Sequence, residues 1–207
     1  MGRRTRMGSD WRVALVLVGA LAVVLPRAWA DRSGTTPLGR REVATVPRLA
    51  LRSSDLAPGN LISLSQVYDG SGCHGGNTSP ALSWSHPPEG TLSFVVLMLD
   101  TDAPGGDFWH WAVFDIPARA RSVRAGAGDP AKGLLPAGAI QVRNDWGLLG
   151  YGGPCPPPGP PHHYHLILYA LRRAKLGLYP SVNAAQVAAR ARADALAEAE
   201  IVGVYGR

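Results

Sequence analysis

Three short segments of the 207-residue chain place carboxylate or imidazole side chains at expected strand ends or in loops. Two carboxylates, Asp100 and Asp102, follow an apolar run, His110 stands among aromatic residues, and a Gly- and Pro-rich loop leads into residues 162–165 (HHYH). A carboxylate that accepts a hydrogen bond from an imidazole fixes its tautomer and favours its protonated form. Such a group of residues can hold an anion or act as a general base, and strand ends are where sites are usually built.

Residues 162–171 (HHYHLILYAL) are typical of a β-strand, in which successive side chains point to opposite faces. His162 and Tyr164 therefore share one face, and His163 and His165 share the other. This division separates the histidines, and their spacing matches none of the short zinc signatures. We expect no metal site and no other cofactor.

His110 belongs to a second expected strand, residues 109–116 (WHWAVFDI). Alternation places it on one face with Ala112, Phe114 and Ile116. A buried imidazole on an apolar face is commonly a core residue without further function, so the residues alone leave the role of His110 open.

The chain as a whole combines short strands, long Gly- and Pro-rich loops and one late helix. That helix is expected over residues 184–199, with Asn183 as its N-cap and Gln186 completing a capping box. Further strands are expected at residues 49–51, 61–67, 81–84, 93–99, 140–142 and 201–205. This order predicts a mainly β protein with an antiparallel β-sandwich, because a doubly wound α/β fold would need alternating helices.

The N-terminus has the organisation of a secretory signal peptide. Four arginines precede or open an apolar run, residues 13–25, and Ala28-Trp29-Ala30 is a small-x-small cleavage site. The run is short for a membrane span, which needs about 20 residues, although an uncleaved anchor is the alternative. We expect a signal peptide over residues 1–30, a flexible segment over 31–48 and one domain over 49–207. The mature protein would be periplasmic or secreted, with no membrane span after cleavage.

The basic charge of the chain is partly a property of this leader. The full chain has a net charge of +6, whereas 16 basic and 14 acidic residues remain after residue 30. The remaining basic residues are scattered, and a nucleic-acid partner requires a concentrated basic face. We therefore expect no nucleic-acid partner.

Two cysteines, Cys73 and Cys155, remain in the expected mature chain. An exported protein meets oxidising conditions that favour a disulfide. Two packed thiols are the alternative, and the sequence leaves both open.

Four motifs follow one another along the chain: Asn77-x-Ser79-Pro80-x-Leu82-x-Trp84, Asp100-x-Asp102-Ala103-Pro104, His110-Trp111, and Gly152-Gly153-Pro154-Cys155-Pro156-Pro157 leading to His162-x-Tyr164. Together they resemble the phosphatidylethanolamine-binding protein family, and in particular its bacterial Raf-kinase-inhibitor-like branch. The closing Gly203-x-Tyr205-Gly206-Arg207 also matches that branch. The resemblance covers roughly residues 49–207, nearly the whole expected mature chain.

The resemblance implies a β-sandwich with a C-terminal helix and a small pocket for phosphate-like anions. Carried over residue by residue, the pocket would comprise Asp100, Asp102, His110, Gly152, Gly153, His162 and Tyr164. The two glycines could bring backbone N–H groups close to an anion, since no side chain intervenes. Two positions depart from the family pattern: Thr101 stands where Pro is common, and Asp194, expected near the pocket rim, stands where close bacterial relatives often carry His.

In functional terms, the resemblance implies an exported binding module for phosphate-bearing ligands such as phospholipid head groups. An inhibitor-type role with an unidentified protein partner belongs to the same class. The alternative is a hydrolase, in which a His/Asp pair in the pocket activates water. No serine lies in a nucleophile-elbow sequence, so we expect a binding protein and not an enzyme.

Overall fold

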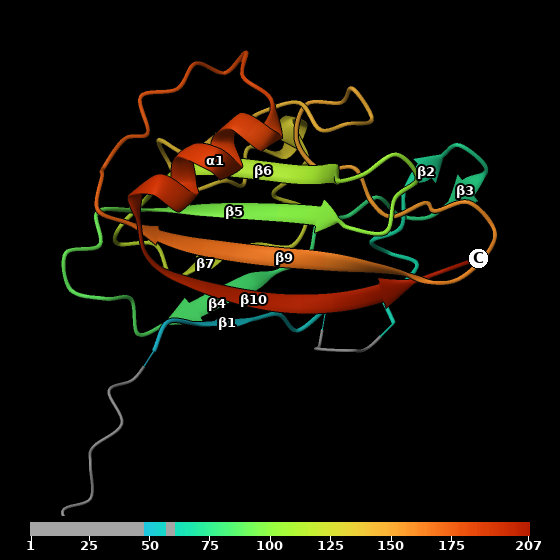
Figure 1. Ribbon diagram of the computed structural model, residues 1–207, viewed down its shortest axis with the longest axis horizontal. Helices are drawn as coiled ribbons and strands as arrows, with labels where there is room; N and C mark the ends of the chain where they lie inside the picture. The colour runs from blue at the N-terminus through green and yellow to red at the C-terminus, as the bar shows by residue number, and fades with distance from the viewer. Residues whose placement is uncertain (1–47, 57–60) are drawn as a thin grey trace, which may run out of the picture. The chain divides into compact units, whose positions relative to one another are not determined.

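The computed structural model describes residues 48–56 and 61–207 (Figure 1). The expected signal peptide, and all of the expected flexible segment except Arg48, lie outside the described residues. The elements are β1 (Ala50–Arg52), β2 (Asp69–Gly70), β3 (Cys73–His74), β4 (Leu82–Ser85), β5 (Ser93–Asp100), β6 (Phe108–Pro117), β7 (Ser122–Val123), the 3-10 helix η1 (Pro130–Lys132), β8 (Ile140–Gln141), β9 (His162–Leu171), α1 (Ala184–Asp194) and β10 (Ala195–Tyr205). Mostly antiparallel strands with one late helix confirm the predicted fold class.

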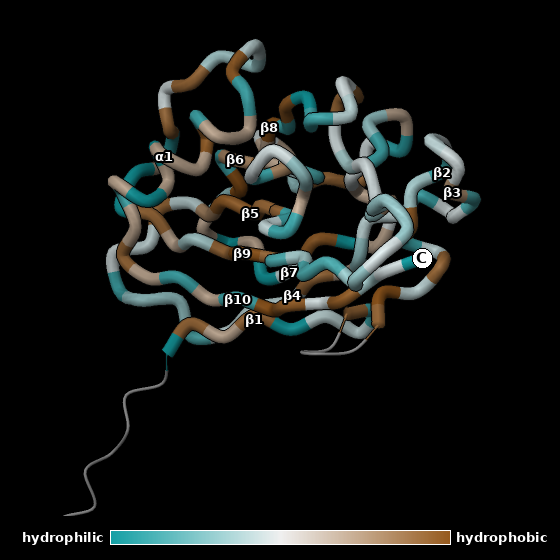
Figure 2. Tube along the Cα trace, turned by 45° about the vertical axis from the view of Figure 1, so that its right-hand side comes forward, coloured by the Kyte–Doolittle hydropathy of each residue, from teal (hydrophilic) through white to brown (hydrophobic). Residues whose placement is uncertain are grey.

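Two sheets enclose the main apolar core. The larger has the strand order β10-β9-β5-β6-β8, and the smaller has the order β1-β4-β7. On β5, Phe94 faces the core between the sheets, whereas Leu97 faces a second cluster that packs against Val187 of α1. All eight residues of β5 are buried, so this strand is covered on both faces. Apolar segments accordingly run through the middle of the domain in Figure 2.

The ends of four long strands of the larger sheet lie together at one end of the sheet, on the right in Figure 1. Asp100, at the end of β5, pairs with Phe108 at the start of β6 and with Tyr164 near the start of β9. Tyr205, at the end of β10, pairs with His162. The pairing register therefore brings segments up to about a hundred positions apart in the sequence to the same end of the sheet.

The helix is shorter than the sequence predicts. The capping box of Asn183 and Gln186 is present, but α1 ends at Asp194 and β10 begins at Ala195. Alanine favours a helix, yet residues 195–200 (ALAEAE) alternate between half-buried and exposed positions and pair along β9. Tertiary pairing therefore overrides local helix propensity in this segment.

The strand expected over residues 61–67 is wrong. Only Leu61 forms a bridge, with Val204, and the chain then turns through hydrogen bonds from Gln66 N to Ser63 O and from Val67 N to Leu64 O. These local bonds occupy backbone groups that a sheet would need.

His110 occupies a β-bulge in β6. Met98 of β5 pairs with Trp111 and Leu99 pairs with Trp109, so His110 is the extra residue between them. A bulge interrupts alternation and re-aims a side chain. The expected common face of His110 with Ala112 and Phe114 is therefore wrong, because those two residues pack toward α1.

Candidate functional site

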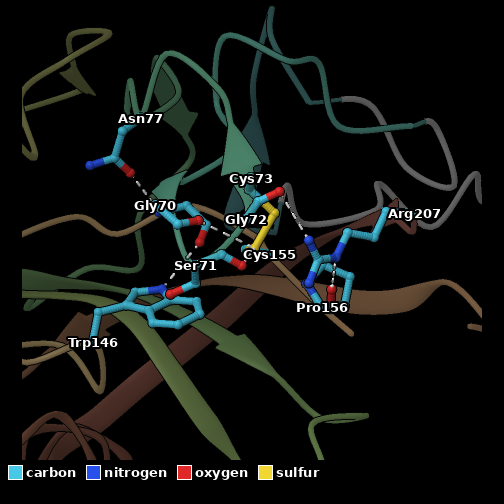
Figure 3. Close-up of a disulfide and its surroundings, with 10 residues drawn as sticks. Gly70, Ser71, Gly72, Cys73, Asn77, Trp146, Cys155, Pro156 and Arg207 are labelled. Atoms are coloured by element: carbon cyan, nitrogen blue, oxygen red, sulfur yellow. Dashed lines mark hydrogen bonds between the residues drawn. A yellow bond between two sulfur atoms is a disulfide. The ribbon is translucent and has the colours of Figure 1, made fainter. Parts of the chain in front are cut away.

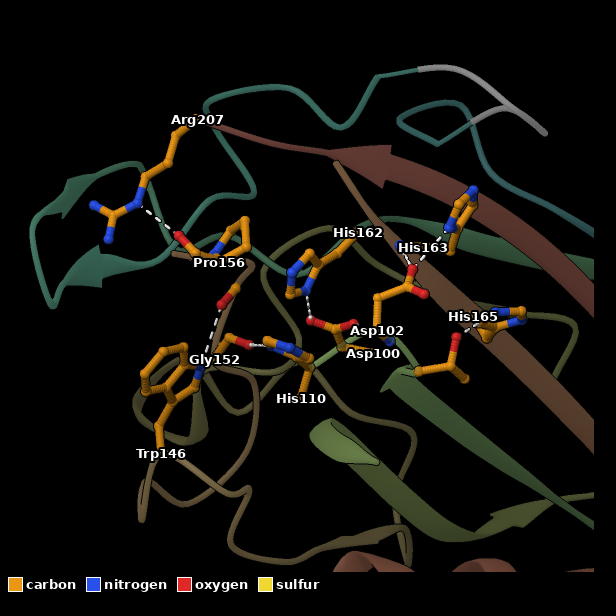
Figure 4. Close-up of polar contacts among 12 residues, drawn as sticks. Asp100, Asp102, His110, Trp146, Gly152, Pro156, His162, His163, His165 and Arg207 are labelled. Carbon is orange, nitrogen blue, oxygen red and sulfur yellow. Dashed lines mark hydrogen bonds and ion pairs between the residues drawn. The ribbon is translucent and has the colours of Figure 1, made fainter. Parts of the chain in front are cut away.

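A cavity of about 240 Å³ opens at the end of the sheet where these strand ends meet. The residues that line it come from the ends of β5, β6 and β9 and from the loops beside them: Asp100, Ala103, Pro104, Phe108, His110, Trp146, Cys155, Pro156, Pro157 and His162. Three of the predicted site residues, Asp100, His110 and His162, thus meet around one space. Figure 4 shows them together near the loop that carries Gly152 and Pro156.

Asp100 and His162 form a buried pair at the base of the cavity. Nδ1 of His162 lies 2.7 Å from Oδ2 of Asp100, and the two residues are 8 % and 3 % exposed. The second carboxylate oxygen accepts the backbone N–H of Asp102 at 2.9 Å. Because the carboxylate of Asp100 accepts this hydrogen bond, Nδ1 of His162 carries a proton. The other ring nitrogen, Nε2, is free to contact a ligand.

His110 is held by a backbone carbonyl instead of a carboxylate. Its Nδ1 donates to Gly152 O at 2.6 Å, and its ring packs edge-on against Tyr164 with 5.3 Å between centroids. Burial lowers the pKa of His110 to about 4, because the charged ring loses its hydration. The ring is therefore neutral near pH 7.

Gly152 and Gly153 do not offer their N–H groups to the cavity. Gly152 N donates to His110 O at 3.0 Å, and Gly153 N donates to Oδ1 of Asn77 at 2.7 Å. The predicted anion contacts by these groups are therefore not available. Instead the two residues act through their carbonyl oxygens, which accept from His110 and from Nε1 of Trp146.

Asp102 faces away from the cavity. Its Oδ2 accepts both the backbone N–H and Nδ1 of His163, each at 2.7 Å, on the outer face of β9. These hydrogen bonds hold the pKa of Asp102 below its ordinary value of 3.8. Asp102 therefore anchors the loop that follows β5, whose Ala103 and Pro104 line the cavity.

We expect the interaction between the side chains of Asp102 and His163 to stabilise the fold at pH values above the lowered pKa of Asp102. In a double-mutant cycle of Asp102→Ala and His163→Ala, the coupling should be about 0.5 kcal/mol, as for other exposed pairs. A depressed carboxylate pKa adds stability above the unfolded pKa and loses it as the pH falls through the folded pKa. The coupling measured by urea unfolding should be smaller near pH 2 than at about pH 5.5. Equal coupling at both pH values would contradict this role of Asp102.

Tyr164 lies beneath the cavity and not on its wall. The residue is fully buried, and its hydroxyl has no hydrogen-bond partner among the described residues. Burial, together with the nearby Asp100 carboxylate, raises the pKa of Tyr164 far above its usual range. Its ring supports His110, and it stays a neutral group.

The apolar walls were mostly not predicted as site residues. Trp146 stacks on Tyr68 with 4.6 Å between ring centroids and meets Phe108 edge-on at 4.8 Å. The prolines at 156 and 157 lie within a motif singled out from the sequence, but Trp146 follows β8 in a loop without such a signal. The position of Trp146 follows from long-range packing.

Two departures from the family pattern lie outside the cavity lining. Thr101 Oγ1 contacts Nε2 of His165 at 3.2 Å on the outer face. Asp194 is buried at the end of α1, where it pairs with Arg173 and Arg190. Because Arg173 follows the far end of β9, Asp194 is remote from the cavity, and its expected place near the rim is wrong.

A disulfide joins Cys73 to Cys155 and forms part of the cavity wall (Figure 3). It connects the β2–β3 hairpin to the loop of residues 152–157. Arg207 fastens the same two segments, since Nε donates to Pro156 O at 2.6 Å and Nη1 donates to Gly72 O at 3.1 Å. The wall is therefore secured by one covalent bond and one guanidinium group.

Within residues 48–56 and 61–207, no group of three or more His, Cys, Asp or Glu side chains is arranged to hold a metal ion. No helix in the same ranges is long and apolar enough to cross a membrane.

The chain is similar in sequence and in structure to known proteins. Residues 52–206 match the family model described as phosphatidylethanolamine-binding protein. The UPF0098 protein YbcL of Escherichia coli is 44 % identical over 155 residues, which cover 74 % of this chain and 85 % of the relative. A crystal structure of E. coli YbcL, described as a new member of the mammalian PEBP family, has a TM-score of 0.76 and 42 % identity and covers 78 % of this chain and 99 % of that one. The putative lipoprotein LppC of Mycobacterium tuberculosis is 38 % identical over 134 residues, 64 % of this chain and 62 % of the relative.

Proposed function

This chain belongs to the phosphatidylethanolamine-binding protein family, and we propose that it is a binding protein for small phosphate-bearing molecules. The binding site is the cavity at the ends of β5, β6 and β9. The observation that carries this proposal is the buried pair of Asp100 and His162, whose Nδ1 and Oδ2 lie 2.7 Å apart. With Nδ1 held by Asp100, the Nε2–H of a protonated ring is free to donate to an anionic oxygen.

The walls of the cavity support recognition of a small polar head with an apolar neighbour. Phe108, Trp146 and the prolines at 156 and 157 surround the two histidines. Ligand sites commonly combine apolar lining with a few fixed polar groups. A head group held at the histidines could therefore extend a short carbon chain along these walls.

The Asp100–His162 pair also favours one alternative, a hydrolase that uses His162 as its general base. Among the lining residues there is no hydroxyl side chain, and Cys155 is held in the disulfide. Water would have to be the nucleophile. Release of inorganic phosphate from a bound phosphate ester would identify this activity.

We also propose that the protein is exported, to the periplasm or outside the cell, after cleavage of residues 1–30. The Cys73–Cys155 disulfide supports this, because such bonds persist mainly in oxidising compartments. The mycobacterial relative named as a putative lipoprotein is compatible with the same route. Any protein partner would then be met outside the cytoplasm.

The proposed function predicts unequal effects of two neighbouring histidines on binding of phosphoethanolamine. His162→Ala should weaken binding by about tenfold or more, because it removes a charged hydrogen-bond donor. His163→Ala is the matched control, since it lies on the outer face and pairs with Asp102. Titration calorimetry measures both variants.

Equal losses in the two variants would contradict the proposed site.

A further inference from the structure

His110 has a fixed hydrogen-bonding role in the cavity. Its Nδ1 lies 2.6 Å from Gly152 O, and a carbonyl oxygen can only accept, so Nδ1 carries the proton. A neutral imidazole has one N–H group. Nε2 of His110 is then a hydrogen-bond acceptor that forms no hydrogen bond with any described residue.

The surroundings keep the ring neutral. His110 is 2 % exposed, with Phe108, Trp146 and Tyr164 packed around it. Two carboxylates, Asp100 on β5 and Asp145 in the loop after β8, favour the charged ring, but burial outweighs them and leaves the pKa of His110 at about 4. From β9, His162 faces the same space with Nδ1 committed to Asp100.

The side chains that line the cavity can balance little negative charge on a ligand. Its lining contains no lysine or arginine, and its ionisable members are Asp100, His110 and His162. With His110 neutral, only His162 can be cationic, and the Asp100 carboxylate already lies against it. A doubly charged phosphate would face a carboxylate with little compensation, whereas a singly charged one requires only the protonated His162.

Resting on the proposed function, we propose that the cavity selects phosphate monoesters in their singly protonated form over phosphodiesters and sulfate esters. The P–O–H group donates to Nε2 of His110, and an ionised oxygen accepts from Nε2–H of His162. A diester or a sulfate ester has no such proton, so its oxygen would meet the lone pair of His110. The ligand class is then a small phosphorylated metabolite or side chain, not the diester linkage of an intact phospholipid.

Three probes of equal charge test this selectivity on the wild-type protein. At about pH 5.5, methyl phosphate is largely a monoanion, because the second phosphate pKa is near 6. Dimethyl phosphate and methyl sulfate are monoanions of similar size that lack the proton. We expect calorimetry to give methyl phosphate an affinity about tenfold or more above both of the others, since an unmet buried acceptor is costly.

A variant separates the role of His110 from general fit. His110→Phe removes the acceptor and should reduce the preference for methyl phosphate to about twofold or less, whereas the control His163→Phe should retain it. If His110→Phe does not fold, the three-probe series on the wild-type protein still decides. Equal binding of the three probes would overturn this selectivity and leave the proposed function intact. Binding of none of them would overturn the proposed function as well.

Discussion

Replacing both Cys73 and Cys155 by serine is expected to lower the free energy of unfolding by about 4 kcal/mol. The two cysteines are 82 positions apart, so the bond removes many conformations of the unfolded chain. Both are buried and pack with Val67, half-buried Tyr68 and Tyr205 in one apolar cluster. Urea unfolding of the oxidised wild type and of the double variant measures the difference.

Reduction of the wild-type protein provides the control for this prediction. Dithiothreitol should bring its stability close to that of the double variant and should leave the variant unchanged. Cys155 lines the cavity, and Gly152, three residues before it in the same loop, accepts the hydrogen bond from His110. Reduction should therefore also weaken binding of phosphoethanolamine. A loss of stability below about 1 kcal/mol would contradict a role for the bond in restricting the unfolded chain.

The parts of the fold that could be predicted from the sequence are those with strong local patterns. The apolar run of β5 and the alternating residues of β9 were placed within one residue of their observed bounds. Alternation also separated His162 correctly from His163, which pairs with Asp102 on the outer face. In these segments burial and periodicity act in the same direction.

The errors arise where long-range contacts override a local pattern. His110 points to the cavity because a bulge in β6 breaks alternation, and nothing in residues 108–111 marks that extra residue. Residues 195–200 are rich in alanine, but pairing with β9 makes them a strand. Trp146 belongs to the wall only because Tyr68 and Phe108 pack against it from distant segments. Each of these features depends on partners that a single segment does not contain.

Gly153→Ala is expected to destabilise the fold by about 3 kcal/mol or more. A Cβ atom at this position would lie 2.0 Å from Gln66 O and 2.6 Å from Tyr68 N. Both are backbone atoms of a segment that is itself held by the hydrogen bond from Tyr68 N to Pro154 O at 3.0 Å. Neither segment can move away without breaking that bond and the one from Gly153 N to Asn77, so the added methyl group has no space.

Gly133→Ala separates crowding from the ordinary cost of replacing a glycine. Gly133 has φ 58° and ψ 30°, and nothing lies within 4 Å of its added Cβ. Gly133→Ala should lower the free energy of unfolding by only about 1 kcal/mol, the penalty of a left-handed backbone for alanine. Thermal or urea unfolding compares the two variants, and equal losses would show that close approach is not the reason for glycine at 153. If Gly153→Ala folds with a displaced loop, His110 would lose its partner at Gly152, and the preference for methyl phosphate over methyl sulfate should fall with the stability.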